Sequence, residues 1–296
     1  MSKVYGILTD NILKMIDAGV APWRRPWDAS RGRSMRPVSI TGTMYRGINY
    51  IMLSTIASMN GWTNIWLTGK MIRERGGSLK EGQEKNASPL YFYKVIEKDD
   101  DSTFPVFRFW PVYNLSQVDG IIVKGVNDGT ENAETNMPIL AAPQSIVDGY
   151  QNAPAIRHNG DPRAYYVPVT DIVNMPDRNT FDTAEHYYAT LFHELAHSTG
   201  HVSRLNRKDL MDNHGFGSHA YSLEELTAEL TSVFLCNECG INNDPMMENA
   251  ANYLADWHKK LKSDPKMFAI AASRAQKAAD LILGKKDNET ENEEKE

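Results

Sequence analysis

One segment divides this chain into two parts. Residues 124–138 read KGVNDGTENAETNMP, and this polar, Asn-, Gly- and Thr-rich segment has no apolar periodicity that would predict a helix or a strand. The chain of 296 residues is long enough for a domain of ordinary size on either side. We therefore predict a first domain over 1–124, a linker over 125–140, a second domain over 141–284 and a disordered acidic tail over 285–296.

The two parts differ in charge. Residues 1–124 hold 17 Lys and Arg against 11 Asp and Glu, a net charge of +6. Because the whole chain carries −6, the remainder carries −12. A basic front half joined to an acidic back half indicates two separate tasks.

Composition also narrows the cellular setting. No apolar run reaches the length of about 18 residues that a membrane span needs, and the first residues lack the pattern of an export signal. The two cysteines, Cys236 and Cys239, follow an apolar helical run, so we interpret them as packed side chains and not as a zinc or redox pair. Such cysteine use suits a reducing compartment, and we predict a cytoplasmic protein with no membrane partner.

Both halves mix helices and strands, so the fold class is predicted as α+β. In the front half, helical patterns over 1–19, 48–61 and 69–77 precede two strands, PLYFYKVIEK and FPVFRFWPVYN, that are joined at DDD. In the back half, RAYYVPVTDIVNMP predicts extended segments, and three helices follow with centres near His193, Glu229 and Trp257. The proline of AYYVPV, Pro168, favours an edge strand, which can pair with an extended peptide.

Two histidines four residues apart lie in the helical segment YYATLFHELAHSTGH. Residues at this spacing share one face of a helix, so His193 and His197 can direct two imidazoles at one point. Glu194, between them, can reach a water molecule there and act as a general base. The spacing predicts an HExxH active-site helix with His193 and His197 as metal ligands and Glu194 as the catalytic residue.

A third ligand is needed, and the helical segment SLEELTAELTSVFL that follows offers three glutamates. Glu225 stands three residues after Ser222, a spacing typical of a capping box at the start of a helix. Glu229 lies one turn further among apolar neighbours, where a buried carboxylate needs a partner. We favour Glu229 as the ligand and keep Glu225 as the alternative, either as a ligand or as a carboxylate that orients a histidine. Glu224 is expected to face solvent.

Two histidines, one carboxylate and an open water position form the donor set of a catalytic zinc site. We therefore predict one divalent metal ion, Zn²⁺ in the first place, with Mn²⁺ or another divalent ion as a substitute. Such a site also needs a hydrogen-bond donor for an oxyanion. The candidate donors are Tyr221, His214 and His219, and His201 is a further candidate ligand.

The stretch WRRPWDASRGRSMRPVSITGTMYR, residues 23–46, is basic and aromatic, with six arginines against one acid. Arginine pairs with phosphates and exposed aromatic rings stack on unpaired bases, so this mixture favours single strands over duplex DNA. The predicted DNA-binding residues are Trp23, Arg24, Arg25, Trp27, Arg31, Arg33, Arg36, Tyr45 and Arg46. Nothing in the stretch indicates a base-reading module, so little sequence preference is expected. A solvated arginine loop with packed tryptophans is the alternative interpretation.

Several strings of this chain resemble ArdC-type antirestriction proteins, which conjugative plasmids carry. In the front half the matching strings are GVAPWRRPW, TGTMYRGINYIML and WLTGKMIRERGG. In the back half they are AYYVPVTDIVNMP, HELAHSTGHVSRLNR and YSLEELTAEL. The resemblance implies an N-terminal domain that binds single-stranded DNA without sequence preference and a C-terminal zincin-like metallopeptidase domain. It also places the metal on His193 and His197, the base at Glu194 and the acidic ligand in the EELTAE helix.

Two hypotheses of different classes follow. In the first, the protein binds single-stranded DNA, carries a metal-dependent peptidase site and protects incoming plasmid DNA from restriction in a donor or recipient bacterial cell. A host restriction protein would then be a peptide substrate. In the second, the protein is a DNA-binding shield whose metal site is structural or not needed for that role. A metal-dependent nuclease is less favoured, because nuclease sites use carboxylate clusters and paired metals.

Overall fold

The computed structural model describes residues 3–21, 37–97, 103–123, 141–181, 183–207, 219–241 and 250–285. The chain forms two compact units: Met1–Ile12 with Pro26–Glu134, and Leu13–Arg25 with Thr135–Glu296. The predicted α+β class with two domains is confirmed. The predicted linker and the tail beyond Lys285 lie outside the described residues.

The first unit contains a four-stranded sheet in the order β1-β2-β5-β4. Its strands are β1 (Val38–Ser39), β2 (Ile65–Thr68), β4 (Ser88–Glu97) and β5 (Thr103–Asn114). β1 is parallel to β2, and the other pairs are antiparallel. A small second sheet pairs β3 (Ser78–Leu79) with β6 (Val118–Asp119). The helical elements are α1 (Lys3–Asp17), which also contributes residues to the second unit, α2 (Gly47–Asn60), α3 (Gly69–Glu74) and the 3₁₀ turn η2 (Leu115–Gln117).

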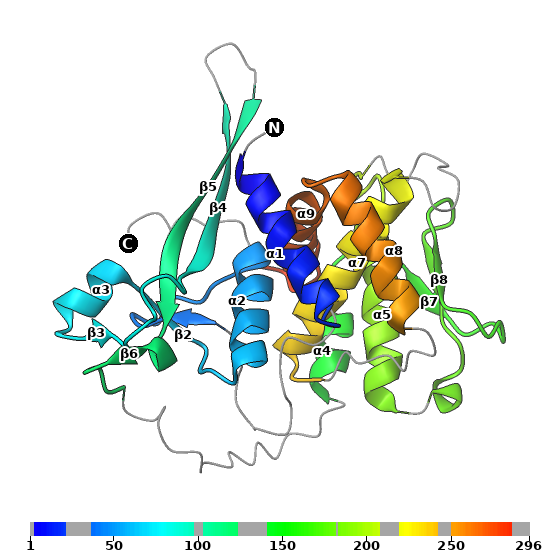
Figure 1. Cartoon of the computed structure of the whole chain (residues 1–296). Helices are drawn as coiled ribbons and strands as arrows, with labels where there is room; N and C mark the ends of the chain where they lie inside the picture. Colours follow the sequence, from blue (N-terminus) through cyan, green and yellow to red (C-terminus); the bar gives the residue numbers. More distant parts are fainter. Residues whose placement is uncertain are drawn as a thin grey trace. The chain divides into compact units, whose positions relative to one another are not determined.

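Strands β4 and β5 form a long two-stranded ribbon (Figure 1). Both strands were predicted, whereas the DDD turn lies outside the described residues. Alternate residues of a strand point to opposite faces, so the two faces carry different aromatic side chains. On one face Tyr91 and Phe107 are buried and stacked, and Tyr5 of α1 packs against Phe107 with ring centroids 4.7 Å apart and planes tilted by 36°.

Helix α2 is held by apolar packing against the sheet. Leu53 and Ala57 are fully buried and lie against Trp66 of β2 and Val112 of β5. The helix ends where Gly61 takes a left-handed conformation with φ 65°, which glycine adopts without a Cβ clash. The sequence predicted this helix and the following one, α3, and both are confirmed.

The second unit is mainly helical. Its helices are α4 (Ala141–Gly149), α5 (Ala184–Ser198), α7 (His219–Glu238), α8 (Ala250–Ser263) and α9 (Met267–Ile282). The predicted helices around His193, Glu229 and Trp257 are confirmed as α5, α7 and α8, whereas α4 and α9 were not predicted. Within the described ranges each helix is too short or too polar to cross a bilayer.

Small side chains bring α7 and α9 close together. The inner face of α9 is a row of buried alanines, Ala271, Ala272, Ala275, Ala278 and Ala279. Helices with small side chains at the contact approach closely, and the Thr231 hydroxyl of α7 reaches the Ala275 carbonyl at 3.4 Å. Both cysteines are free thiols. Cys236 of α7 is fully buried, so its interpretation as a packed side chain is confirmed, whereas Cys239, just past the end of α7, is only partly buried.

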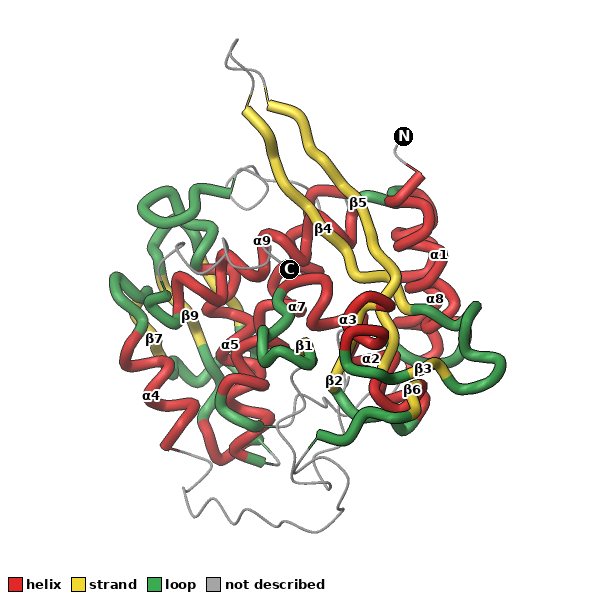
Figure 2. The backbone as a smooth tube through the Cα atoms, turned by 90° about the vertical axis from the view of Figure 1, so that its left-hand side faces the viewer, coloured by secondary structure: helices red, strands yellow, loops and turns green. Residues whose placement is uncertain are grey.

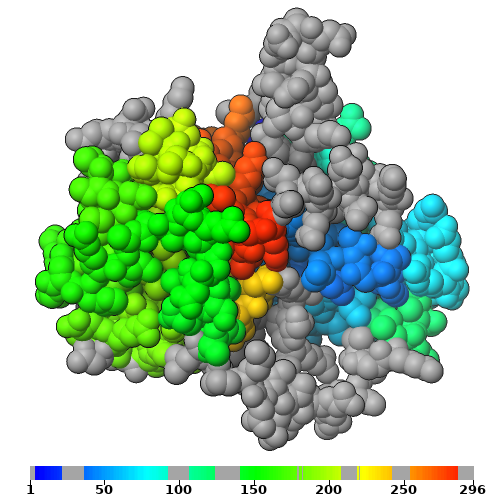
Figure 3. Space-filling view, turned by 180° about the vertical axis from the view of Figure 1, so that it is seen from behind, coloured from blue at the N-terminus to red at the C-terminus, as the bar shows by residue number. Residues whose placement is uncertain are grey.

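A three-stranded sheet, ordered β7-β9-β8, lies beside α5 (Figure 2). Its strands are β7 (Ala155–Arg157), β8 (Tyr165–Val167) and β9 (Ile172–Asn174), followed by the 3₁₀ turn η3 (Arg178–Thr180). β8 is an edge strand, as the proline of its segment predicted. Figure 3 shows residues 141–181 (green) covering one face of the second unit, next to the end of α9 (red).

Candidate metal centre

Helix α5 carries the histidine pair. It begins where the Thr183 hydroxyl accepts a hydrogen bond from the His186 amide, 3.2 Å away, which satisfies a free backbone donor of the first turn. Its apolar side is fully or almost fully buried through Leu191, Phe192 and Leu195. This packing fixes the rotation of the helix about its axis and therefore the direction of the opposite face, where the histidines stand.

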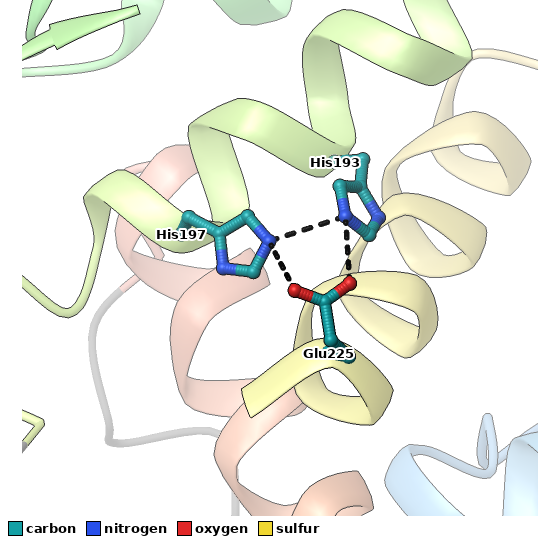
Figure 4. A group of neighbouring side chains, drawn as sticks. All are labelled: His193, His197 and Glu225. Atoms are coloured by element: carbon teal, nitrogen blue, oxygen red, sulfur yellow. Dashed lines mark hydrogen bonds and ion pairs between the residues drawn. The ribbon is translucent and has the colours of Figure 1, made fainter. Parts of the chain in front are cut away.

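His193, His197 and Glu225 of α7 converge (Figure 4). The two Nε2 atoms lie 3.1 Å apart, and the imidazole planes are nearly perpendicular, at 80°. The Glu225 carboxylate places Oε2 3.7 Å from His193 Nε2 and Oε1 3.6 Å from His197 Nε2. Two neighbouring turns of one helix and one turn of another thus point three donor atoms at a common centre.

The spacing of these donors fits a single divalent ion. Ligand atoms about 2.1 Å from one ion at tetrahedral angles lie about 3.4 Å apart, and the three observed separations fall between 3.1 and 3.7 Å. Two imidazole nitrogens this close repel each other unless a proton or a cation stands between them. The side chains of His193 and Glu225 remain 26% and 29% exposed, so water can reach the centre.

The carboxylate at the centre belongs to Glu225, whereas the sequence favoured Glu229. That preference assumed a helix start at Ser222, with Glu225 occupied in the cap. Helix α7 begins at His219 instead, so Ser222 and Glu225 are ordinary positions of the helix body. Glu229 lies one turn further, a rise of about 6 Å, and influences His193 through its charge.

A buried ion pair holds His197 in place. Nδ1 of His197 lies 3.1 Å from Oε1 of Glu224. Arg207 donates hydrogen bonds to both oxygens of that carboxylate, at 2.6 and 2.8 Å. Arg207 also donates to the Thr199 hydroxyl and the Ala196 carbonyl at the end of α5. The expectation that Glu224 faces solvent is therefore wrong, because its side chain is only 5% exposed.

This contact also fixes the tautomer of His197. Burial opposes the charged form of Glu224, but the hydrogen bonds from His197 and Arg207 outweigh it and lower the pKa of Glu224 to about 2. An ionised carboxylate only accepts hydrogen bonds, so Nδ1 of His197 carries the hydrogen. In the neutral imidazole the lone pair is then on Nε2, the atom that faces the centre.

The neighbouring charges act strongly on His193. Burial disfavours a charged imidazole, but the hydrogen bond to Glu225 and the charges of Glu194, Glu225 and Glu229 outweigh it and raise the pKa of His193 to about 9. In the absence of an ion, His193 therefore holds a proton at neutral pH. This positive charge takes the place of a cation beside the carboxylates. Glu194 is buried and, among the described residues, makes no hydrogen bond.

Of the other candidates that the structure describes, Tyr221 alone lies at the centre. Burial and the adjacent Glu225 carboxylate, which accepts its hydrogen bond, raise the pKa of Tyr221 to about 12. His219 is exposed, and its Nε2 lies 2.8 Å from the carboxylate of Asp264, so it is not part of the centre. His201 pairs with the Ser203 hydroxyl, and His214 lies outside the described residues.

Sequence reasoning also missed a second buried arginine, Arg204, whose side chain is 2% exposed. It donates to the carbonyls of Ser198 and Asn152, both at 2.7 Å, to the carboxylate of Asp171 and to the hydroxyl of Tyr166. The last two residues belong to the β8–β9 hairpin. Arg204 therefore ties the end of the histidine helix to the edge of the small sheet.

Most of the predicted DNA-binding stretch lies outside the described residues. This holds for Trp23, Arg24, Arg25, Trp27, Arg31, Arg33 and Arg36. Tyr45 is partly buried against the cluster of Leu53 and Trp66, and Arg46 precedes the first turn of α2, where its carbonyl accepts the Asn49 amide. These two described positions thus have structural contacts within the first unit.

Comparison with known proteins identifies the class first. Residues 149–274 match the zincin-like metallopeptidase family, and residues 2–144 match the N-terminal domain of anti-restriction factor ArdC. The chain is a two-domain protein with a zincin-like domain behind an ArdC N-terminal domain. It belongs to the ArdC antirestriction family.

Solved structures agree along almost the whole chain. Crystal structures of the antirestriction protein ArdC from plasmid R388, one metal-free and one Mn(II)-bound, are 33% identical to it, with TM-scores of 0.72 and 0.73. The matches cover 95% and 96% of this chain and 97% and 98% of those chains.

Curated relatives differ in length. The protein y4eC of Sinorhizobium fredii is 30% identical, with 99% of this chain and 95% of y4eC covered. Two Escherichia coli proteins named DNA primase TraC are 34% and 33% identical over 93% and 94% of this chain. This chain spans only 26% and 20% of the length of those primases.

Proposed function

We propose that this protein protects incoming plasmid DNA from host restriction during conjugation by binding single-stranded DNA without sequence preference. We further propose that its zincin-like domain holds one divalent ion at His193, His197 and Glu225 and cleaves a peptide bond. The observation that carries the metal site is the convergence of three donor atoms at the spacing of an ion's ligands. A Mn(II)-bound structure of the R388 ArdC protein supports it, and Zn²⁺ fits the same donors.

The residues around the centre have distinct roles in this proposal. A bound divalent ion supplies Lewis-acid polarisation and makes water more acidic. The Glu194 carboxylate accepts the proton of the attacking water and passes it to the leaving amine. The Tyr221 phenol donates a hydrogen bond to the oxygen that becomes negative. Glu224 and Arg207 hold the His197 ring in the orientation that directs Nε2 at the centre.

The edge strand β8 is the proposed peptide-binding element. An edge strand has unpaired backbone groups that can accept an extended chain as an additional strand. β8 is antiparallel to β9, and Arg204 connects this hairpin to the end of α5. An extended segment of a host restriction protein is therefore the substrate class that we propose.

The metal site is tested by paired substitutions on α7. Glu225→Gln removes a charged donor at the centre, whereas Glu229→Gln removes a carboxylate one turn away. We expect Glu225→Gln to lower the affinity for Zn²⁺ and Mn²⁺ by more than about a hundredfold. This exceeds the loss of about 10- to 100-fold that is typical when a residue hydrogen-bonded to a metal ligand is replaced. Titration calorimetry on the metal-free protein measures this. Equal losses in both variants would refute the proposed ligand set.

The enzymatic role is tested with Glu194→Gln, which keeps the metal ligands intact. A peptidase should keep its ion and lose turnover of an unfolded protein substrate by several orders of magnitude. Restriction protection in transformed cells separates the two hypotheses. Full protection by the variant favours the alternative, in which the protein is a DNA-binding shield whose metal site is structural.

The DNA-binding role is tested on the whole chain with fluorescently labelled oligonucleotides. Binding through phosphates must weaken as salt rises, with a logarithmic slope of about −0.7 per phosphate contact on single strands. The ArdC N-terminal domain match supports this role. Binding that is absent at low salt would refute it.

A further inference from the structure

The β4–β5 ribbon exposes apolar side chains, a few residues from its base, that a sheet normally covers. Trp110 and Phe109 of β5 are 46% and 40% exposed. They are neighbours in the strand, so they lie on opposite faces of the ribbon. An exposed tryptophan on a regular strand can be an interaction site. The residues that surround it indicate which class of ligand it binds.

On the Trp110 face, three side chains form a continuous surface, which we call the hairpin platform: Phe92, Arg108 and Trp110. Phe92 lies directly opposite Arg108 in the strand register, and Trp110 is the next residue on the same face. The rings of Phe92 and Trp110 meet edge to face, with centroids 5.7 Å apart and planes at 72°. This contact orients the indole while nearly half of its surface stays in water.

The platform begins where the sheet's own packing ends. The next residues on this face towards the base of the ribbon, Leu90 and Val112, pack with Leu53 and Trp66. Beyond them, this packing no longer covers the face. An aromatic pair of this kind adds less than about 1 kcal/mol to the stability of a ribbon, so stability alone is a weak reason for an exposed indole at this position.

Arg108 gives the platform its charge. Its side chain is exposed and, within the described part of the chain, forms neither an ion pair nor a hydrogen bond. The described side chains of this face, from Ser88 to Phe92 and from Arg108 to Asn114, include no acid. A purely apolar partner, such as a second copy of the same face, would bury this guanidinium without compensation, which is costly.

We propose that the hairpin platform is a base-stacking site for single-stranded DNA. An unpaired base can lie on the indole of Trp110 while the guanidinium of Arg108 pairs with an adjacent phosphate. The inference rests on the proposed DNA-binding function and assigns it a surface outside the basic stretch of residues 23–46. Bases in a duplex are already stacked on each other, so the platform selects single strands by structure and not by sequence.

The test uses the full-length protein and a labelled 20-nucleotide strand, alone and annealed to its complement. Trp110→Ala should weaken single-strand binding about 5- to 100-fold, the range for loss of one base–aromatic stack, and leave duplex binding unchanged. Trp110→Phe should retain most of the affinity. Phe109→Ala, a neighbouring and similarly exposed ring on the opposite face, is the matched control and should change the affinity less than twofold.

Arg108→Gln gives an independent measurement. Loss of one phosphate contact should reduce the magnitude of the logarithmic salt slope on single strands by about 0.7, and Arg157→Gln, an exposed arginine of the second unit, should not change it. Thermal midpoints of all variants establish that they fold.

The outcomes distinguish a failure of the hairpin platform from a failure of the proposed DNA-binding function. If the native protein binds single strands and the variants at Trp110 and Arg108 bind equally well, the platform is refuted and the proposed function stands. If the native protein binds no single strand at low salt, the proposed function fails and the platform with it. If Trp110→Ala instead converts a dimer to a monomer in sedimentation without a change in DNA affinity, the surface is a self-contact and the proposal is overturned.

Discussion

The α5–α7 helix pair and the β4–β5 ribbon depart from ordinary burial in opposite ways. At the helix pair, the charged side chains of Glu224, on α7, and Arg207, in the segment after α5, are buried and hydrogen-bonded to each other. In the ribbon, Trp110 is half exposed and Arg108 has no partner in the described part of the chain. A metal site needs donor atoms at fixed separations, whereas a surface that accepts any base needs adaptable contacts. Rigid, paired charges therefore suit the recognition of an ion, and open, unpaired groups suit a ligand of variable structure.

The largest expected effect is on stability, from breaking the buried pair. Arg207→Ala leaves the Glu224 carboxylate buried without its main partner, and we expect a loss of about 3–5 kcal/mol in the free energy of unfolding. Urea denaturation of the metal-free protein measures it. Arg163→Ala, which removes an exposed ion pair with Asp161, is the control and should leave the unfolding midpoint unchanged. A small loss with Arg207→Ala would show that the helix pair is less rigid than the comparison assumes.

The next effect concerns metal affinity. Glu224→Gln weakens the partner of His197 Nδ1 and frees the ring, so the affinity for Zn²⁺ should fall about 10- to 100-fold while the ligands stay in place. Calorimetry with Glu238→Gln as a control tests this, because Glu238 lies on the same helix and pairs with Lys285 instead. Unchanged affinity in Glu224→Gln would mean that α5 orients His197 without help.

A smaller effect follows from pH. Because the pKa of His193 is raised to about 9 in the metal-free protein, an ion must displace a proton at neutral pH, and metal affinity should fall about tenfold for each pH unit below 9. The same proton stabilises the metal-free fold fully below pH about 6.5, the ordinary pKa of histidine, and this stabilisation is lost as pH rises through 9. Calorimetry in buffers of different ionisation enthalpy should detect about one proton released per ion at pH 7. No release would contradict the raised pKa.

The smallest expected effect is the stability change on the ribbon. Trp110→Ala removes an exposed ring and one edge-to-face pair, and it should lower the free energy of unfolding by less than about 1 kcal/mol. Urea denaturation beside the Arg207 variant gives the contrast directly. A loss as large as that of Arg207→Ala would mean that Trp110 is a structural residue, which would weaken its assignment to DNA.

The sequence predicted those parts of the site that depend on local geometry. His193 and His197 share a helix face at any position of α5 in the fold, so their spacing was sufficient. The proposed third ligand depends on which turn of α7 is level with them, and tertiary packing alone sets that level. Glu224 was missed for a related reason: α7 is buried on several sides, through Leu223, Thr227 and Ser232, so its pattern does not indicate a solvent face.

The same distinction applies to the fold. The alternating pattern of β4 and β5 and the stop at Gly61 are local signals, and both elements were predicted. Helix α9 is rich in alanine, whose burial depends on how closely α7 approaches, and the helix was not predicted. Arg207 could have been suspected from its place in the ArdC-like string, but its partner could not be read from the chain order.

The hydrogen bonds from Arg207 to the Ala196 carbonyl and the Thr199 hydroxyl hold the end of α5, which carries His197, in one conformation before an ion binds. Loading then requires dehydration of the incoming cation and departure of a proton, with no helix to refold. Ions should accordingly exchange on the timescale of ligand binding, and divalent cations of similar radius should compete according to their free concentrations. The ion recovered with the purified protein would then reflect the growth medium as much as any preference of the site.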